Sequence, residues 1–400
     1  MPRLPGDLSG HLAWWEHEGR HLLLVQTWEE GRGRAHVATV DPATGELLGE
    51  WSRDADDEPG GDFLMAPGGG FYYYTFTRLF KADVAGGRLV QVAVNPTPAE
   101  CRCLAISPSG LLGTDTYDLG YAFTLDRATG LSRSHGKVWA DDHRANHGPA
   151  AFAGRRGRSL LANHGEAMPG LWATDTRTNA HCRIGEAAVQ LVRFGDGSVW
   201  GTQGPNPASI AFDPQTCWTP SWSSRLGRLF RYWAGSETVI LFSEVGQVGP
   251  IAEAPGRAGR LLAAVGRELL ILEVAEMQVL ERVALPGECV AMTGAGRRRS
   301  VYLLLADGAL LHGRGWRRSV RLQTACTDFG RAERGLMVLP QSGAVVGIAL
   351  DGQLSVWRPG NPTVTRLSAP SPPPAGPAVD PAEDAWYYAD RVVTRFTLEG

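Results

Sequence analysis

The sequence lacks an excess of charge of either sign. Charged residues make up 20% of its 400 residues, and the formal net charge is −3 at pH 7. Lysine is almost missing: Lys81 and Lys137 are the only two, so arginine carries nearly all of the positive charge. Without a global electrostatic field, the composition does not indicate a protein that binds nucleic acid or a membrane. We therefore expect neither as a partner.

The sequence has no long apolar run either, and we expect no secretory leader. No run of about 18 apolar residues could span a bilayer, and the segment Met1 to Asp7 has no apolar leader region. The six cysteines show no paired metal-ligand spacing, and Cys101-Arg-Cys103 is too short for a zinc knuckle. We expect free thiols in a reducing compartment, and hence a cytoplasmic location.

What the sequence does have is a turn that recurs after short apolar runs. Its copies are Asp41-Pro-Ala-Thr-Gly45, Asp83-Val-Ala-Gly-Gly87, Asp126-Arg-Ala-Thr-Gly130, Asp175-Thr-Arg-Thr-Asn179 and Asp213-Pro-Gln-Thr-Cys217. The spacings are 42, 43, 49 and 38 residues, in a chain with 50 glycines and 26 prolines. A repeat of roughly 40–50 residues built from short strands is the sequence pattern of a β-propeller. The predicted fold class is therefore all-β.

Each repeat reads as four strands, A to D. The second predicts strands at 63–66, 71–75, 79–83 and 89–94, and the third predicts 103–106, 111–114, 121–125 and a D strand near Lys137-Val-Trp139. Residues 226–288 break the period, and 378–400 repeat only A to C. Counting turns predicts about eight four-stranded blades, although seven or nine would also fit. We expect residues 1–400 to form a single domain, a ring closed by its N- and C-terminal segments.

One segment carries a family resemblance. Residues 261–358, with Asp351-Gly-Gln-Leu-Ser-Val-Trp357 as the example, resemble WD-repeat and quinoprotein-like propeller repeats. The Gly-His and Trp-Asp dipeptides of the WD-repeat family are absent as a set. The resemblance therefore implies a fold and does not imply a particular partner.

In a propeller, the A–B and C–D turns come to one face, and the B–C and D–A loops come to the other. This rule places the arginine clusters Arg155-Arg156-Gly-Arg158, Arg257-Ala-Gly-Arg260 and Arg297-Arg298-Arg299 in A–B turns. Acidic residues at 54–58 and 141–142 fall on the opposite face. One interpretation is solvated turn charges without a partner. The other is a basic face, formed by Arg155, Arg156, Arg158, Arg257, Arg260, Arg297, Arg298 and Arg299, that docks an acidic protein surface or phosphates.

The fourth repeat holds a histidine cluster. Asp142-His143-Arg-Ala-Asn146-His147 precedes its A strand, and Asn163-His164-Gly-Glu166 follows its B strand. The loop rule puts His147 and His164 near each other, where they can bind a divalent metal or one can act as a general base. The residues expected to line the same mouth are Arg78, Asp115, Tyr117, Glu166, Gln203 and Asn206. Alternatively, the Asn-His-Gly units are only turn residues, or they bind a ligand without chemistry.

This placement resembles that of propeller lyases such as streptogramin lyase and oligogalacturonate lyase, although no motif of those families matches residue by residue. A lyase reading implies His147 or His164 as the base, with Arg78 and Tyr117 as further catalytic candidates and a divalent metal as the only cofactor to consider. Loops between 261 and 358 carry few groups able to do acid–base work. The sequence therefore favours a non-catalytic scaffold that binds another protein, or a small molecule, through its loop rims. A lyase or hydrolase is the alternative.

Overall fold

The chain folds as a series of antiparallel β-sheets. In the computed structural model, no helix occurs among the described residues, and hence none that is long and apolar enough to cross a membrane. The structure describes residues 8–17, 20–29, 34–54, 63–65, 71–74, 78–83, 88–94, 101–107, 109, 111–116, 121–126, 129, 131–138, 150–154, 156–164, 170–186, 188–203, 228–234, 240–241, 248–295, 299–314, 320–332, 335–339, 341–349, 351, 353–368, 378–380, 385–389 and 393–396. The strands fall into two compact units, which we describe separately.

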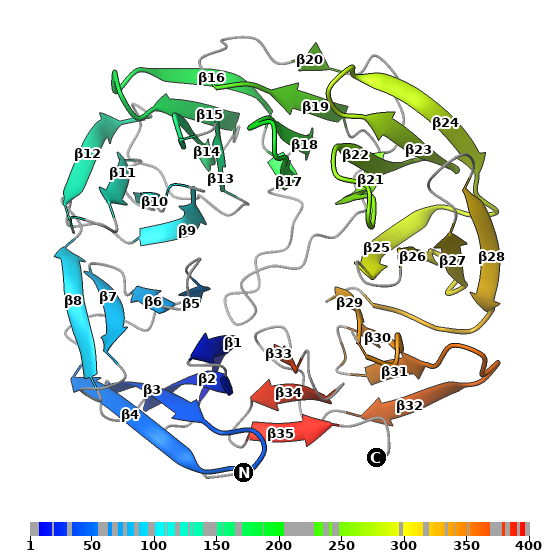
Figure 1. The fold of residues 1–400 in the computed structure, drawn as a ribbon, viewed down its shortest axis with the longest axis horizontal. Coiled ribbons are helices and arrows are strands. Elements are labelled where there is room, and N and C mark those ends of the chain that lie inside the picture. Colours follow the sequence, from blue (N-terminus) through cyan, green and yellow to red (C-terminus); the bar gives the residue numbers. More distant parts are fainter. Residues whose placement is uncertain are drawn as a thin grey trace. The chain divides into compact units, whose positions relative to one another are not determined.

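Unit 1 contains the sheets built from residues 8–137 and 378–396. Its four-stranded sheets are β1 (Leu8–His17), β2 (Arg20–Glu29), β3 (Arg34–Val40) and β4 (Leu47–Asp54); β5 (Phe63–Met65), β6 (Phe71–Tyr74), β7 (Arg78–Asp83) and β8 (Arg88–Val94); and β9 (Cys101–Ile106), β10 (Leu111–Thr116), β11 (Tyr121–Asp126) and β12 (Ser132–Lys137). A three-stranded sheet holds β33 (Ala378–Asp380), β34 (Ala385–Ala389) and β35 (Val393–Phe396). Within each sheet, every strand pairs with the next one in sequence (Figure 1).

Unit 2 contains five four-stranded sheets from residues 151–368. They are β13 (Ala151–Ala153), β14 (Ser159–His164), β15 (Gly170–Asp175) and β16 (His181–Glu186); β17 (Ala188–Arg193), β18 (Val199–Gln203), β19 (Arg228–Tyr232) and β20 (Ile240–Leu241); β21 (Val248–Glu253), β22 (Arg260–Val265), β23 (Glu268–Glu273) and β24 (Gln278–Ala284); β25 (Cys289–Ala295), β26 (Ser300–Leu305), β27 (Leu310–Arg314) and β28 (Arg321–Cys326); and β29 (Gly335–Val338), β30 (Val345–Ile348), β31 (Gln353–Trp357) and β32 (Val364–Ser368). Their A strands are neighbours in sequence order, from β13 through β17, β21 and β25 to β29.

The apolar core of unit 2 lies between successive sheets. For example, Phe230 and Tyr232 of β19 pack with Leu161 and Ala173 of the preceding sheet. All six residues of β26 are buried. Because each sheet is covered on both faces, both sets of alternating side chains must be apolar, and the strands read as continuous hydrophobic runs. The outer strand β24 instead alternates between exposed and half-buried residues.

The predicted strands agree with the structure except at one outer strand. Strands β5 to β8 match the prediction for the second repeat to within one residue at most ends. The D strand predicted near Lys137-Val-Trp139 lies earlier in the chain, because β12 spans Ser132–Lys137 and meets the prediction only at Lys137. Its residues 132–134 are exposed, so no apolar run marks it. A buried polar contact links it to β11: the ring Nε2 of His135 lies 2.8 Å from the Thr124 hydroxyl.

The irregular stretch 226–288 has a simple explanation. Strands β19 and β20 complete the sheet begun by β17 and β18, and β21 to β24 form one further sheet. Residues 204–227 connect β18 to β19, so the Asp213 turn falls between the B and C strands and not between C and D. The fifth copy therefore matches the other turns in sequence but not in its place in the strand order. Its own structure lies outside the described residues.

Both ends of the chain contribute to unit 1. The last sheet has three strands among the described residues, as predicted for 378–400. Residues 8–54 form a sheet of their own, and its strand β1 lies beside β33 and β34. The number of blades, the closure of a ring and the single-domain boundary remain predictions.

Candidate functional site

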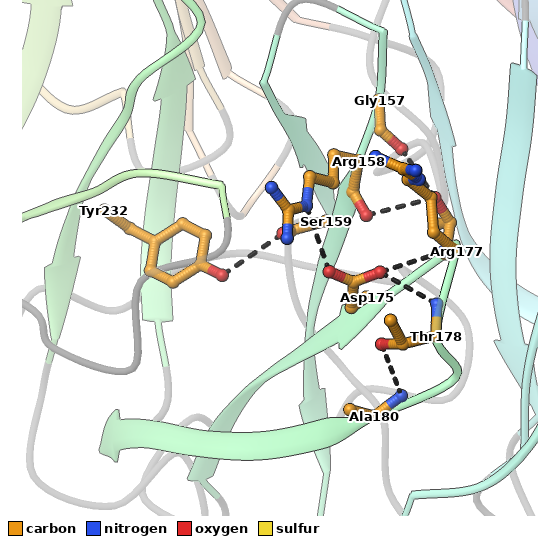
Figure 2. Close-up of polar contacts among 9 residues, drawn as sticks. Gly157, Arg158, Ser159, Asp175, Arg177, Thr178, Ala180 and Tyr232 are labelled. Carbon is orange, nitrogen blue, oxygen red and sulfur yellow. Dashed lines mark hydrogen bonds and ion pairs between the residues drawn. The ribbon is translucent and has the colours of Figure 1, made fainter.

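The recurring turn is held by its own acidic side chain. In the turn after β15, Asp175 Oδ1 accepts hydrogen bonds from the backbone N–H groups of Arg177 (2.9 Å) and Thr178 (3.0 Å), as Figure 2 shows. The Thr178 hydroxyl in turn accepts one from the Ala180 N–H at 3.3 Å. Asn179, the fifth residue, has a left-handed φ of 62°. Asp and Thr therefore recur because their short oxygens cap the turn locally.

The same turn occurs in other sheets and in both units. Asp41 Oδ1 accepts from the Ala43 N–H at 2.9 Å, and Gly45 has φ 73°. In the turn from Glu273 to Met277, the fifth residue again has a positive φ, 55°. A left-handed fifth residue explains why glycine or asparagine closes the clearest copies. The sequence also marks the turn near Glu273, and Met277 shows that a residue other than glycine or asparagine can take the left-handed position.

An arginine from the A–B turn braces each of these C–D turns. The ion pairs are Arg20 Nη2 to Asp41 Oδ2 at 2.6 Å, Arg158 Nε to Asp175 Oδ2 at 3.1 Å, and Arg260 Nε to Glu273 Oε2 at 3.3 Å. We call this arrangement of arginine and acidic turn residue the turn brace. Arg158 and Arg260 were predicted to bind a partner. Their pairing with a turn carboxylate gives them a structural role that the sequence analysis missed.

The brace also affects the acid. Burial raises the pKa of Asp175, but the backbone hydrogen bonds from Thr178 and Arg177 and the pairing with Arg158 outweigh it and lower the pKa below its usual value. The pKa of Asp41 is lowered by the same balance of causes. Each carboxylate is thus ionised at neutral pH and bound in place.

The A–B and C–D turns of unit 2, with the strand-end residues beside them, form one edge that we call the turn rim. Adjacent sheets touch along it. The Gly154 N–H donates to the Gly197 carbonyl at 2.7 Å, joining two A–B turns, and the Arg299 side chain lies over Gly256 of another A–B turn. The rim is therefore continuous across neighbouring sheets.

Exposed charge on the described part of the rim is mainly positive. Its exposed arginines are Arg156, Arg158, Arg177, Arg299, Arg314, Arg321 and Arg358. Its exposed acids are Asp196, Glu253 and Glu276. The opposite edge of unit 2 is mixed, with Arg267 and Arg331 among the exposed carboxylates Glu186, Asp307, Asp328 and Asp351. Positive potential therefore concentrates at the turn rim.

One rim arginine is not available for binding. Arg231 of β19 is 4% exposed and pairs with Asp196 at 2.8 Å. Its guanidinium lies 4.2 Å from the centre of the Trp233 ring, a cation–π distance. Its Nη1 also donates to the Ala275 carbonyl of the next sheet at 3.4 Å. Arg231 thus joins two sheets, and no motif in the sequence marks it.

The predicted histidine site is described only in part. His164 is the last residue of β14, and Gln203 is the last residue of β18. The backbone of Ala188 pairs with Gln203 and is hydrogen-bonded by Asn163. The ends of the two B strands therefore lie near each other on the edge opposite the turn rim, which is where the loop rule puts them.

Asn163 is not a turn residue, contrary to one interpretation of the Asn-His-Gly unit. It lies in β14 and is 2% exposed. Its amide donates to the Ala188 carbonyl and accepts from the Ala188 N–H, both at 2.8 Å. Gln190 bonds the Ile251 backbone of the following sheet in the same way, at 2.7 and 2.9 Å. We call these two contacts the amide clamps, and their function is to join sheets.

Most of the other predicted site residues lie outside the described part of the chain or are placed by their backbone alone. His147, Tyr117, Glu166, Asn206, Arg155, Arg297 and Arg298 lie outside the described residues. Arg78 begins β7 and Asp115 lies in β10, both in unit 1. Arg156, Arg257 and Arg299 lie in A–B turns, as predicted. Among the residues that the structure describes, no group of three or more His, Cys, Asp or Glu could hold a metal ion. The catalytic, metal and ligand roles remain predictions.

A further histidine was not singled out by the sequence. The His312 ring of β27 stacks on Tyr302 with the ring centres 4.7 Å apart, and its Nε2 accepts a hydrogen bond from Arg314 Nε at 3.1 Å. Burial, and next the positive charge of Arg314, lower the pKa of His312 to about 4. It is neutral at pH 7 and serves packing.

Comparisons with known proteins identify the fold. No protein-family model matches the chain, and no curated protein matches it. The solved structure of the Dos1 propeller is similar over 100% of this chain and 95% of that chain, with a TM-score of 0.54 and 12% identity. The Cps50 (Swd1) β-propeller domain of Myceliophteria thermophila covers 76% of this chain and 98% of its own, with a TM-score of 0.44 and 10% identity. Streptogramin B lyase covers 75% and 94%, with a TM-score of 0.42 and 10% identity.

These likenesses bear on architecture. The scores for the last two structures are too low to carry an argument, and identities of this size say nothing about activity. The full-length likeness to the Dos1 propeller, together with four-stranded antiparallel sheets that follow one another in sequence, confirms the prediction. The chain has a β-propeller fold.

Proposed function

We propose that this protein is a non-catalytic interaction scaffold that binds another protein through its turn rim. The observation that carries the proposal is the concentration of exposed arginines on one continuous edge of unit 2. Charged groups on a rim steer encounter with a complementary partner and set orientation. A rigid series of sheets joined by buried clusters suits this task, because loops and turns can vary on a fixed support.

The polar side chains that the structure describes support the same reading. Asn163 and Gln190, the buried amides of inner strands, bond backbone groups of the neighbouring sheet. Arg231 and His312 are likewise occupied in packing. These groups serve structure, whereas the rim arginines are the ones exposed to solvent.

Cross-linking in cells tests the proposal. We expect the protein to be cross-linked to a partner through residues of the turn rim. The double variant Arg156→Glu/Arg177→Glu should lose this cross-linked partner. The control variant Arg267→Glu/Arg331→Glu, with the same change of charge on the opposite edge, should keep it. Cross-links that map to the opposite edge, or that survive the rim variant, would show the proposal to be wrong.

A further inference from the structure

We infer that the partner segment docking on the turn rim is an acidic polypeptide, recognised through separate carboxylates. The inference rests on the proposed function and adds the chemistry of the occupant. Exposed arginines are spaced around several sheets, from Arg156 and Arg177 beside β14 and β16, through Arg299, to Arg358 before β32. The rim therefore offers a row of positive groups and not a single pocket.

The first reason is the chemistry of the cation. All seven exposed basic residues on the described rim are arginines. The planar guanidinium presents paired N–H donors that match the two oxygens of a carboxylate. A row of such groups fits Asp and Glu side chains placed at intervals along a protein segment.

The second reason is what stands between the arginines. Exposed Glu253 and Glu276, and the side chain of Asp196, belong to the same rim. A phosphate chain carries a charge at every nucleotide and would be repelled at those points. A polypeptide can place neutral or basic residues opposite them, so the acids interspersed among the arginines favour protein over nucleic acid.

The third reason is the lack of a stacking surface. No aromatic side chain is exposed among the described residues of the rim. Proteins that bind single strands combine basic grooves with aromatic side chains on which bases stack. The described rim has the charge without the aromatics, so a nucleic-acid strand would have only salt-sensitive contacts.

Two rim arginines hold acidic turn residues in ion pairs. Arg158 is bound to Asp175, and the buried Arg231 is bound to Asp196. Arg156, Arg177 and Arg358 are exposed and lie in different turns of the rim. They are the residues to which we assign contact with the acidic segment.

Binding of defined probes to the full-length protein tests the inference. The probes are a fluorescein-labelled peptide of alternating glutamate and serine, the matching glutamine–serine peptide, and a DNA duplex of equal charge, all at the same salt concentration. We expect the glutamate peptide to bind and the glutamine peptide to fail. Arg156→Glu/Arg177→Glu should weaken glutamate-peptide binding by about tenfold or more. The control pair Arg267→Glu/Arg331→Glu should change it by less than about twofold.

Each outcome decides between alternatives, provided that both variants keep the wild-type unfolding temperature. Tighter binding of the DNA, no binding of the glutamate peptide, or equal loss in both variants would overturn the inference. A cellular partner that cross-links to the rim but is not displaced by the glutamate peptide leaves the scaffold function intact and rejects an acidic segment. Arg358→Glu provides a second rim variant distant in sequence from the first pair, and it should also weaken the peptide.

Discussion

At the scale of single residues, several polar side chains of unit 2 are held by contacts with their neighbours. His312 is the clearest case. It lies on the face of β27 toward Tyr302, and its ring stacks at an interplanar angle of 12°. A protonated ring would be desolvated there and would face the Arg314 guanidinium without a lone pair to accept its hydrogen bond. The neutral form is therefore the one that the fold stabilises.

This gives a pH-dependent stability with a definite sign. The folded pKa of His312, about 4, lies below its ordinary value of 6.5. Between these values the unfolded chain binds more protons, so the free energy of unfolding falls as the pH is lowered through this window. His312→Phe keeps the stack and removes the titration. We expect the wild type to lose unfolding temperature relative to His312→Phe from pH 6.5 toward pH 4, in thermal melts followed by circular dichroism. A constant difference between the two proteins over that window would contradict the assignment.

At the scale of elements, the turn brace explains why one short sequence pattern recurs. The acid caps its own turn and binds an arginine that begins the B strand or precedes it, so the two turns at one edge of a sheet are fixed together. Asp126, whose Oδ1 accepts from the Thr129 N–H at 3.3 Å, shows the cap in a third sheet. The contacts that hold the outer hairpin thus account for the pattern.

Substitution of Asp175 separates the two parts of the brace. Asp175→Ala removes both backbone hydrogen bonds and the ion pair, and it should cost about 1–2 kcal/mol. Asp175→Asn keeps the Oδ1 acceptor and loses only the partly exposed ion pair, so its cost should stay below about 1 kcal/mol. Hydrogen exchange measured by mass spectrometry should show faster exchange at 176–186 in Asp175→Ala.

The matched control for this turn is Asp351→Ala. Asp351 is an exposed carboxylate whose Oδ1 accepts from the Gln353 N–H at 2.9 Å, and no arginine in the described part of the chain braces it. We expect it to alter exchange locally and by less. If Asp351→Ala destabilises its sheet as much as Asp175→Ala, the brace contributes nothing beyond an ordinary turn.

The sequence predicts most of these elements and few of their tertiary contacts. Period, apolar runs and turn residues locate the inner strands, because burial on both faces leaves a continuous hydrophobic signal, as in β26. The strand β12 is misplaced because its residues 132–134 are exposed and polar, and because the buried contact of His135 with Thr124 leaves no local pattern in the sequence. The face of each arginine cluster follows from strand order. That Arg158 and Arg260 are braced, and that Asn163 is a clamp, depends on partners distant in sequence, and no local pattern contains that information.

At the scale of the whole molecule, a β-propeller needs its sheets to stay in register with one another, and apolar packing between sheets has little direction. In unit 2, the amide clamps supply directional contacts between neighbouring sheets. Asn163 fixes β14 to the start of β17, and Gln190 fixes β17 to β21. Both bond a backbone N–H and C=O together, so they resist sliding of one inner strand along the next. The strand β17 is the element that both clamps share.

Removing a clamp should therefore loosen two sheets at once. Asn163→Leu keeps side-chain volume but leaves the buried N–H and carbonyl of Ala188 without this partner, at a cost of about 2–4 kcal/mol. Hydrogen exchange should quicken in β13–β16 and in β17–β20 together, and Gln190→Leu should do the same for β17–β20 and β21–β24. Gln353→Leu changes an exposed amide on β31 whose hydrogen bond, from Arg366 of β32, stays within its own sheet; it is the control and should affect only that sheet. Exchange that rises in one sheet alone after Asn163→Leu would mean that apolar packing by itself keeps the sheets aligned.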